Sequence, residues 1–444
     1  MIEMTPEFAV FIMFSLMLVG LLLGHPLAFV LGGVGAIIGF VGWGPGALFL
    51  MVSRTYSTLN NQILIAIPLF VLMAVFLEKS GIAEGLFTAM MHLFGKLRGG
   101  VALTVTILSV IFAATTGVVG ASVVSMALMS IPVMMKYNYD KQLAAGVVTA
   151  GGTLGILIPP SIMLILMADQ SGQSVGRLFA GSFIPGLLLG SLYFIYVLVL
   201  AKLHPEKAPA LTDDQRSEIN KAQLIRMLLI NFIPPILLIL GVLGTIWMGV
   251  ATPTEASGVG AFIAFVLMIV YGQFSWKTLV TCLKQALVTN AMVMATIIGA
   301  SIFTGVFLGL GGGDVVTDVI LSMEGYGRWA IFAMMMFIIF ILGFLIDWIG
   351  IIFISFPIFL PIANQLGFDP TWFVVILAIN LQMSFLTPPV GYSLFYLKGS
   401  VDPKVMNLGH IYRGIVPFIF LQLIGLLLCI LFPSTVTFMA NLVG

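Results

Sequence analysis

The chain has 444 residues, of which 60% are hydrophobic and only 8% are charged, and its formal net charge is +1. A soluble globular protein carries about 25% charged residues, so this chain has too little polar surface to fold in water. The small net charge also excludes the basic surface that nucleic-acid binding requires. A lipid bilayer is therefore the predicted surrounding, and no nucleic-acid partner is expected.

The first hundred residues contain apolar segments long enough to cross the bilayer core of about 30 Å as helices. Glu3 and Glu7 precede the first of them without the basic flank of a signal peptide, so this segment is expected to be retained. The segments 44–60 and 81–98 are interpreted as interfacial or arm helices. Residues 1–100 are thus predicted to form scaffold spans and arm helices.

A polar connector at residues 202–226 divides the chain into two halves. It holds Lys202, Lys207, Arg216, Lys221 and Arg226 among acidic residues. Loops rich in lysine and arginine stay on the cytoplasmic side of a membrane, so the connector is predicted to be cytoplasmic. The region around it, 178–328, is predicted to supply further scaffold spans.

An internal repeat relates residues 101–177 to residues 329–397. Four pairs of residues share an offset of 229 positions: Pro132 and Pro361, Asp140 and Asp369, Pro159 and Pro388, and Pro160 and Pro389. Such repeats underlie many secondary transporter folds, and both segments are predicted to form a transport domain.

The basic residues change sides between the two copies. In the first copy, Lys136 and Lys141 lie in the turn after the marker proline, whereas the equivalent turn of the second copy has no basic residue. In the second copy, Lys398 and Lys404 instead follow the Pro-Pro pair. The copies are therefore predicted to be inverted relative to one another across the membrane.

Each copy begins with an apolar segment that is interrupted near its middle, at 115–120 within 101–135 and at 347–350 within 329–363. A straight helix over either segment would be about 52 Å long, more than the bilayer needs, and each half is expected to be too short to cross alone. Both segments are therefore predicted to be re-entrant hairpins whose tips are buried in protein or line a wet cavity.

Each copy continues with a span that a Pro-Pro pair interrupts, at 143–167 and at 371–396. Paired prolines remove backbone donors and disfavour helix before them, which leaves upstream carbonyl groups free. A cation held between each hairpin tip and its broken span would satisfy these carbonyls. The alternative is a kinked helix whose free carbonyls are satisfied by Ser or Thr hydroxyls.

The first hairpin tip combines glycines with the hydroxyl groups of Thr115, Thr116 and Ser122. Unwound carbonyls suit a cation such as sodium, and exposed helix amino termini suit a carboxylate. The alternative interpretation is close packing of small residues between membrane helices.

Asp347 follows a long apolar run and lies at the second hairpin tip. A carboxylate at the membrane centre costs at least about 2.5 kcal/mol, so Asp347 is expected to face a cavity. It would bind the substrate or tune a nearby cation site; the alternative is a structural cap on a half-helix. Asn380, Gln382 and Ser384 would add neutral polar groups.

These patterns predict one substrate site and two sodium sites. The substrate-binding residues are predicted to be Asp347, Thr116, Ser122, Gln382 and Asn380. The first sodium site is predicted from Thr115, Gly117, Gly120, Gly152, Thr153, Gly155 and Pro159. The second is predicted from Ile346, Trp348, Gly350, Gln382, Ser384, Thr387 and Pro388.

No catalytic site is predicted, because no nucleophile triad, HExxH motif or phosphate-binding loop occurs in a supporting context. An intramembrane enzyme that used Asp347 would lack a second acid or a metal cluster at membrane depth. The two cysteines, Cys282 and Cys429, have no metal-ligand spacing.

The chain resembles the large membrane subunit, of the DctM type, of tripartite ATP-independent periplasmic (TRAP) transporters. The resemblance covers nearly the whole chain, and four features carry it: 152–161 (GTLGILIPPS), 252–256 (TPTEA), the Asp347 hairpin and 386–391 (LTPPVG). Within TPTEA, Glu255 is expected to cap the start of a span.

The resemblance implies an all-α polytopic membrane protein, an inverted-repeat transporter of the elevator type with two re-entrant helical hairpins and two broken spans. Residues 398–444 would supply a C-terminal loop and span. Sodium would be the coupling ion, with no organic cofactor. The implied partners are a separate small four-span membrane subunit, a periplasmic substrate-binding protein and a small organic acid, in the bacterial inner membrane. The alternative is a stand-alone ion-coupled carboxylate or anion transporter of similar architecture.

Overall fold

The computed structural model describes residues 4–117, 119–212, 220–322 and 324–443, with the backbone alone at residues 114–116, 221 and 324. Within these ranges every regular element is a helix and no strand occurs. Eight of the described helices are long and apolar enough to cross a membrane, or nine if the bent pair α4 and α5 is one span. The protein is therefore a multi-pass helical membrane protein, as predicted.

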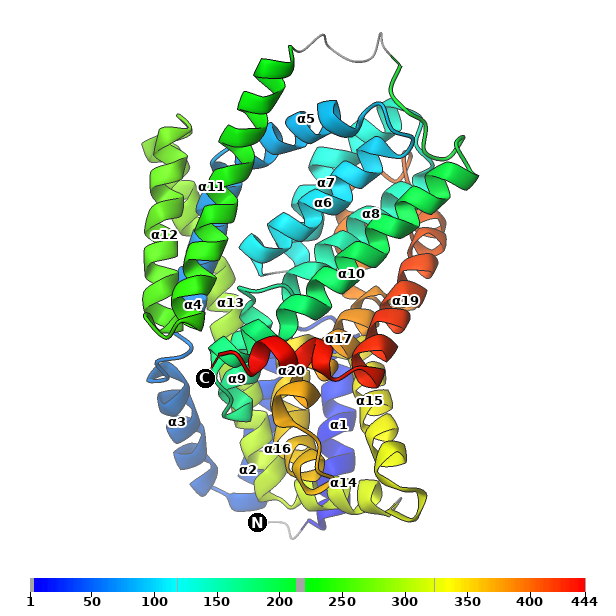
Figure 1. Cartoon of the computed structure of the whole chain (residues 1–444). Helices are drawn as coiled ribbons and strands as arrows, with labels where there is room; N and C mark the ends of the chain where they lie inside the picture. Colours follow the sequence, from blue (N-terminus) through cyan, green and yellow to red (C-terminus); the bar gives the residue numbers. More distant parts are fainter. Residues whose placement is uncertain (1–3, 118, 213–219, 323, 444) are drawn as a thin grey trace.

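The described helices outside the two repeated segments pack against them or against one another and are called the framework here (Figure 1). Their bounds are α1 Pro6–Leu22, α2 Leu27–Trp43, α3 Gly46–Leu59, α4 Ala66–Lys79, α5 Ile82–Phe94, α10 Val175–Leu203, α11 Lys221–Trp247, α12 Pro253–Val270, α13 Trp276–Gly309, α14 Gly312–Leu321, α19 Leu408–Leu431 and α20 Ser434–Ala440. The two most extensive contacts pair α2 with α13 and α12 with α4.

The TPTEA motif forms the start of α12. The Thr252 hydroxyl accepts a hydrogen bond from the Glu255 backbone amide, and the Glu255 carboxylate accepts one from the Thr252 amide, which together form a capping box. Pro253 occupies the first helical turn, where its missing N–H has no cost. The predicted capping role of Glu255 is confirmed.

The first repeated segment is broken twice. Its elements are α6 Gly100–Thr116, α7 Val119–Lys136, α8 Lys141–Thr153, the 3-10 turn η1 Leu154–Ile156 and α9 Ile162–Ser171. Gly117 ends α6 with a φ of 60°, a left-handed conformation that glycine adopts without strain. The second break follows η1 and contains the Pro159–Pro160 pair, so both interruptions lie where the sequence predicts them.

The second repeated segment has the same order of four α-helices. These are α15 Arg328–Leu345, preceded by the 3-10 turn η3 Glu324–Tyr326, then α16 Trp348–Gln365, α17 Pro370–Leu386 and α18 Tyr392–Ser400. Ile346 and Asp347 are extended and separate α15 from α16. Residues 387–391 separate α17 from α18 around Pro388 and Pro389, whose peptide bond, like that of Pro159 and Pro160, is cis.

One length-based expectation is wrong. The helices α7, α15 and α16 each have 18 residues and are apolar enough to cross a membrane, so these hairpin halves are not too short to span it. At a rise of 1.5 Å per residue each is about 27 Å long, close to the thickness of the bilayer core. Length alone therefore does not decide whether they re-enter or cross.

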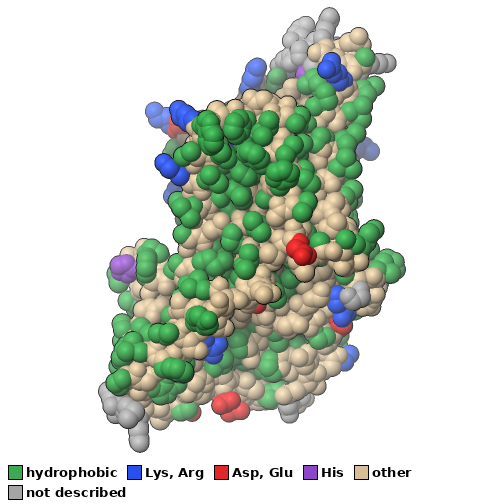
Figure 2. All heavy atoms as spheres, turned by 90° about the vertical axis from the view of Figure 1, so that its left-hand side faces the viewer, with side chains coloured by type: hydrophobic (Ala, Val, Ile, Leu, Met, Phe, Trp, Pro, Cys, Tyr) green, Lys and Arg blue, Asp and Glu red, His purple; other side chains and the backbone are tan. Residues whose placement is uncertain are grey.

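The surface suits a lipid environment. On the face that Figure 2 shows, hydrophobic side chains cover much of the molecule, whereas Lys and Arg gather toward its upper end. Phe262 of α12 and Leu237 of α11 are 66% and 63% exposed, which is favourable only where lipid replaces water.

Candidate substrate chamber

A chamber of about 430 Å³ lies between the framework and the repeated segments. The framework helices α2 and α13 line one part of it, and α7, α9, α16, α17 and α18 line the remainder. Both hairpins and both broken spans therefore contribute to a single cavity.

Five described helices begin at the chamber wall. Its lining includes the first residues of α2, α7, α9, α16 and α18, which are Leu27, Val119, Ile162, Trp348 and Tyr392. The first backbone N–H groups of a helix have no partner within the helix, and its amino terminus carries about half a positive charge. The chamber is therefore electrostatically suited to an anion.

Asp347 is the one charged side chain among the described residues that line the chamber. It occupies the N-cap position of α16 and keeps partial exposure because the chamber reaches it. The backbone amides of Trp348 and Ile349 lie beside its carboxylate, but neither completes a capping hydrogen bond of ordinary geometry. Asp347 faces a cavity, as predicted.

Two tyrosines from the first two turns of α18 close the chamber. The Tyr392 hydroxyl donates a hydrogen bond of 3.3 Å to the Leu345 carbonyl and so ties α18 to the second hairpin. The Tyr396 ring lies against Gly120 of the first hairpin, where a Cβ atom would come within 2.9 Å of the ring carbon Cζ. Gly120 therefore allows close approach of α7 and α18.

The first hairpin tip also adjoins the break in its own broken span. A Cβ atom on Gly117 would lie 3.3 Å from the Ile162 amide nitrogen and 3.4 Å from the Pro160 carbonyl oxygen. The tip and the Pro-Pro break are therefore adjacent, as a cation held between them would require.

Among the predicted substrate-binding residues, Asp347 lines the chamber, whereas Ser122, Asn380 and Gln382 lie elsewhere. Ser122 lines a separate cavity next to α4 and α5. Asn380 is buried and donates a 2.7 Å hydrogen bond to the Met336 carbonyl of α15. Gln382 is buried and donates to the Thr153 hydroxyl. The Thr116 side chain lies outside the described part of the chain.

The residues of the first predicted sodium site have different environments. Thr153 donates to the Ala150 carbonyl and accepts from Gln382. A Cβ atom on Gly152 would collide with Val123 of α7, so this glycine serves helix packing. Gly155 and Pro159 are buried at the break, and Gly120 faces Tyr396. The Thr115 side chain is outside the described residues.

The residues of the second predicted sodium site are likewise divided. Trp348 lines the chamber, whereas Ile346 is fully buried and a Cβ atom on Gly350 would contact α2. The hydroxyl groups of Ser384 and Thr387 donate to the carbonyls of Leu381 and Met383 within the same helix. Pro388 lies in the break after α17.

A metal site of charged ligands is absent from the described ranges, where no group of three or more His, Cys, Asp or Glu side chains could hold an ion. One neutral acceptor is notable: Gln382 Oε1 is fully buried and has no hydrogen-bond partner in the described chain. A buried acceptor without a partner is costly, so an additional donor or cation at this position would be stabilising.

The sequence matches the model of the family described as "Tripartite ATP-independent periplasmic transporter, DctM component" over residues 13–435. The chain belongs to this family. It is the large permease of a TRAP transporter, and the family is one of transport proteins rather than enzymes.

Curated relatives cover almost the whole permease. It is 30% identical over 402 residues to the C4-dicarboxylate TRAP transporter large permease protein DctM of Pseudomonas aeruginosa, covering 90% of this chain and 91% of the relative. It is 28% identical over 428 residues to the 2,3-diketo-L-gulonate TRAP transporter large permease protein YiaN of Escherichia coli, covering 96% and 97%.

A solved structure supports the fold. The YdaH transporter of Alcanivorax borkumensis, whose report notes "an unusual topology", matches with a TM-score of 0.65 at 13% identity and covers 94% of this chain and 98% of that one. At this identity the likeness concerns the fold alone.

Several lining residues of the permease chamber were not predicted from sequence. Besides Tyr392 and Tyr396, they include Thr289 and Thr296, two turns apart on α13. The tyrosines had a local signal, since they are spaced i, i+4 directly after the second Pro-Pro break. The threonines had none, because α13 belongs to the framework and only folding places it opposite the hairpins.

Proposed function

We propose that this permease imports a C4-dicarboxylate or a related small organic acid, coupled to sodium, from a periplasmic binding protein. It would work with a small four-span membrane subunit in the bacterial inner membrane. The observation that carries this proposal is the convergence of five helix amino termini on one chamber. Such termini bind carboxylates in other transporters built from discontinuous helices.

The chamber's size and walls suit a small acid. Ligand sites usually measure about 300–1,000 Å³ and combine apolar walls with a few polar groups, and this chamber falls within that range. Tyr392, Tyr396 and Thr289 supply hydroxyl groups for a substrate that also bears polar atoms. Two relatives are named for acids of this kind, which supports the same class here.

Sodium coupling gives Asp347 and the broken spans a common role. Two carboxylates in one chamber repel each other, so an anionic substrate beside Asp347 requires a neighbouring cation. The breaks leave carbonyl groups at the ends of α6, α8, α15 and α17 without helical partners, and these are suitable ligands. The carbonyls of Ile156, Leu345 and Phe385 accept hydrogen bonds from nearby Ser or Tyr hydroxyls, and each keeps a second lone pair for a cation. Each net charge that crosses a potential of 100 mV contributes about 2.3 kcal/mol, enough to drive accumulation.

The position of the chamber supports an elevator mechanism. The framework helices α2 and α13 form one wall and the repeated segments form the other, so movement of the repeated segments against the framework would carry the substrate across. The inverted relation between the copies would give two such positions of similar energy.

Uptake by proteoliposomes tests the proposal. The permease and its small subunit are reconstituted, and entry of radiolabelled succinate is measured with and without a sodium gradient and with and without the binding protein. Uptake that requires both supports the proposed function. Sodium-independent uptake by this chain alone would favour the stand-alone transporter instead and overturn the tripartite proposal.

A further inference from the structure

Three cavities form a series that begins at the substrate chamber. The chamber shares Gly120, Thr289 and Tyr396 with a second cavity of about 300 Å³. The second cavity shares Ala74 and Glu78 with a third of about 640 Å³. Shared walls make the three spaces neighbours, so a small movement of their side chains would join them into one route.

The third cavity lies at the end of the molecule that carries the connector. Gly81, in the turn between α4 and α5, and Gln273 both line this cavity. They lie close together, since a Cβ atom on Gly81 would be 3.4 Å from the Gln273 side chain. Gln273 lies between α12 and α13. The helix α11 begins after the connector and leads away from it, and α12 runs back toward the same end of the molecule (Figure 1). The loop after α5 also bonds the connector, through Gly99 N to Ala208 O and Leu211 N to Gly95 O. The route therefore leads toward the predicted cytoplasmic side.

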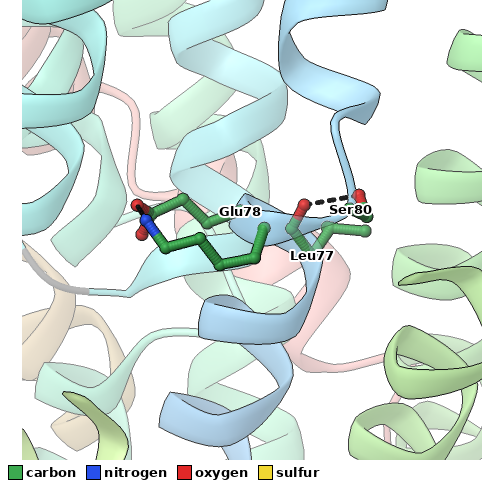
Figure 3. A network of polar contacts seen from close by, with 4 residues as sticks. Leu77, Glu78 and Ser80 are labelled. Atoms are coloured by element: carbon green, nitrogen blue, oxygen red, sulfur yellow. Dashed lines mark hydrogen bonds and ion pairs between the residues drawn. The ribbon is translucent and has the colours of Figure 1, made fainter. Parts of the chain in front are cut away.

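An ion pair between Lys79 and Glu78 lines this route. Lys79 Nζ lies 3.0 Å from Glu78 Oε1; Glu78 lines both the second and the third cavities, and Lys79 lines the third. Both side chains are partly exposed to these spaces. Figure 3 shows Glu78 projecting from one side of the end of α4 and the hydrogen bond from Ser80 to Leu77 on the other.

The local backbone holds the pair in place. The Ser80 hydroxyl donates a 2.6 Å hydrogen bond to the Leu77 carbonyl and accepts one of 3.3 Å from the Ile82 amide, so it joins the end of α4 to the start of α5. Gly81 completes the bend with a φ of 76°. The pair is thus fixed at its backbone, while the Lys79 side chain keeps the flexibility of its four-carbon stem.

A carboxylate that leaves the chamber by this route must pass Glu78. An unpaired Glu78 would repel it, whereas a paired Glu78 would not. Lys79 lies beyond Glu78 as seen from the chamber and is the one basic residue in the described linings of these three cavities. A second acid, Glu84, lines the third cavity too, so Lys79 is the group there that can attract a carboxylate. An ammonium group in partly exposed surroundings exchanges partners readily, since such pairs contribute little net stability.

We infer that Lys79 receives the substrate carboxylate during release to the cytoplasm, exchanging Glu78 for the substrate and then returning to Glu78. Glu78 keeps Lys79 in position and is neutralised by it between transport cycles. This inference rests on the proposed function, because it assumes that the cargo is an organic anion that passes through the chamber.

Charge restoration by chemical modification tests the role of Lys79. Cys282 and Cys429 are first replaced by Ala, since Cys282 lies near the pair and the introduced cysteine is then the one thiol left for the reagents. Lys79→Cys in this background should lower succinate uptake about tenfold, the effect of losing one contact to a charged group. A cationic methanethiosulfonate reagent applied inside the proteoliposomes should then restore uptake, and an anionic reagent of similar size should not.

Two matched variants complete the test. Lys79→Arg should retain most of the uptake, and Lys277→Cys, at the same end of the molecule but outside these cavities, should respond to neither reagent. Equal effects of the two reagents at Lys79→Cys, or unchanged uptake in Lys79→Met, would overturn the inference while leaving the proposed function intact. Failure of the wild-type complex to take up succinate would instead count against the proposed function itself.

Discussion

Gln382 donates a 3.2 Å hydrogen bond to the hydroxyl of Thr153, and these two residues are 229 positions apart, the offset that relates the two copies of the repeat. Residues that correspond in two copies can touch each other only near the axis that relates the copies. Both lie in broken spans, Gln382 near the end of α17 and Thr153 at the end of α8. This contact is what a two-fold relation between the copies would require, with its axis between the two broken spans.

Removing the hydroxyl from this contact should destabilise the permease. Thr153→Val leaves the buried Gln382 amide without its acceptor, and the free energy of unfolding should fall by about 1 kcal/mol, in the range for buried hydrogen bonds in membrane proteins. Chemical unfolding in detergent, with Gln382→Leu and the double variant, measures the coupling. Thr149→Val is the control, because the Thr149 hydroxyl bonds only its own helix in the described structure. Additive effects of the two substitutions would show that the bond contributes nothing.

Asp347 should be essential for transport but not for folding. Asp347→Ala and Asp347→Asn remove the only charge that the described lining of the chamber contributes, and succinate uptake should fall to background. Membrane insertion and association with the small subunit should persist, as gel filtration of the complex would show. Asp318→Asn, on the exposed side of α14, is the control and should transport normally. Normal uptake by Asp347→Ala would remove this residue from the mechanism.

Gly120 should control the shape of the chamber. In Gly120→Ala the added methyl group would come within 2.9 Å of the Tyr396 ring and push it into the cavity, so uptake should fall several-fold with little change in thermal stability. Combining it with Tyr396→Ala should relieve the collision. Gly399→Ala on the same helix as Tyr396 is the control, because nothing in the described structure lies within 4 Å of the added atom. Equal losses in both single variants would argue against a specific contact.

Gly152 should act through packing between α8 and α7. Gly152→Ala places a methyl group against Val123, and overpacking of this kind costs about 1–3 kcal/mol in the free energy of unfolding. Val123→Ala in the same chain should recover most of the loss. Gly241→Ala in α11, where nothing described lies within 4 Å, should be neutral or slightly stabilising. If Gly152→Ala instead weakened sodium dependence at unchanged stability, the predicted sodium site would be favoured over packing.

The sequence predicted both interruptions in each copy because each has a local cause. Gly117 allows a left-handed turn, paired prolines remove backbone donors, and Asp347 cannot remain within an apolar helix. The cap at Thr252 and Glu255 is equally local, because all its atoms lie within one turn of helix. Features of this kind depend only on residues that are close in the sequence, so they can be predicted from it.

The contacts of three polar residues near the breaks could not be predicted from the sequence. Asn380, Gln382 and Ser122 were grouped with Asp347 because all are polar residues near breaks. In the structure, Asn380 donates a hydrogen bond to the Met336 carbonyl and Gln382 donates one to the Thr153 hydroxyl. Ser122 lines another cavity. Helix rotation decides which side chain faces the chamber, and packing between distant helices sets that rotation.

By itself, the sequence determined that this protein belongs in a bilayer, that a pattern of prolines and aspartates recurs at an offset of 229 positions, and where its helices break, since hydrophobicity, proline and glycine act through the solvent and the local backbone. Only the tertiary structure decided that five helix amino termini meet at one chamber and that Tyr396, Thr289 and Thr296 help to enclose it. Those residues come from segments far apart in the chain, and their meeting depends on how whole helices pack.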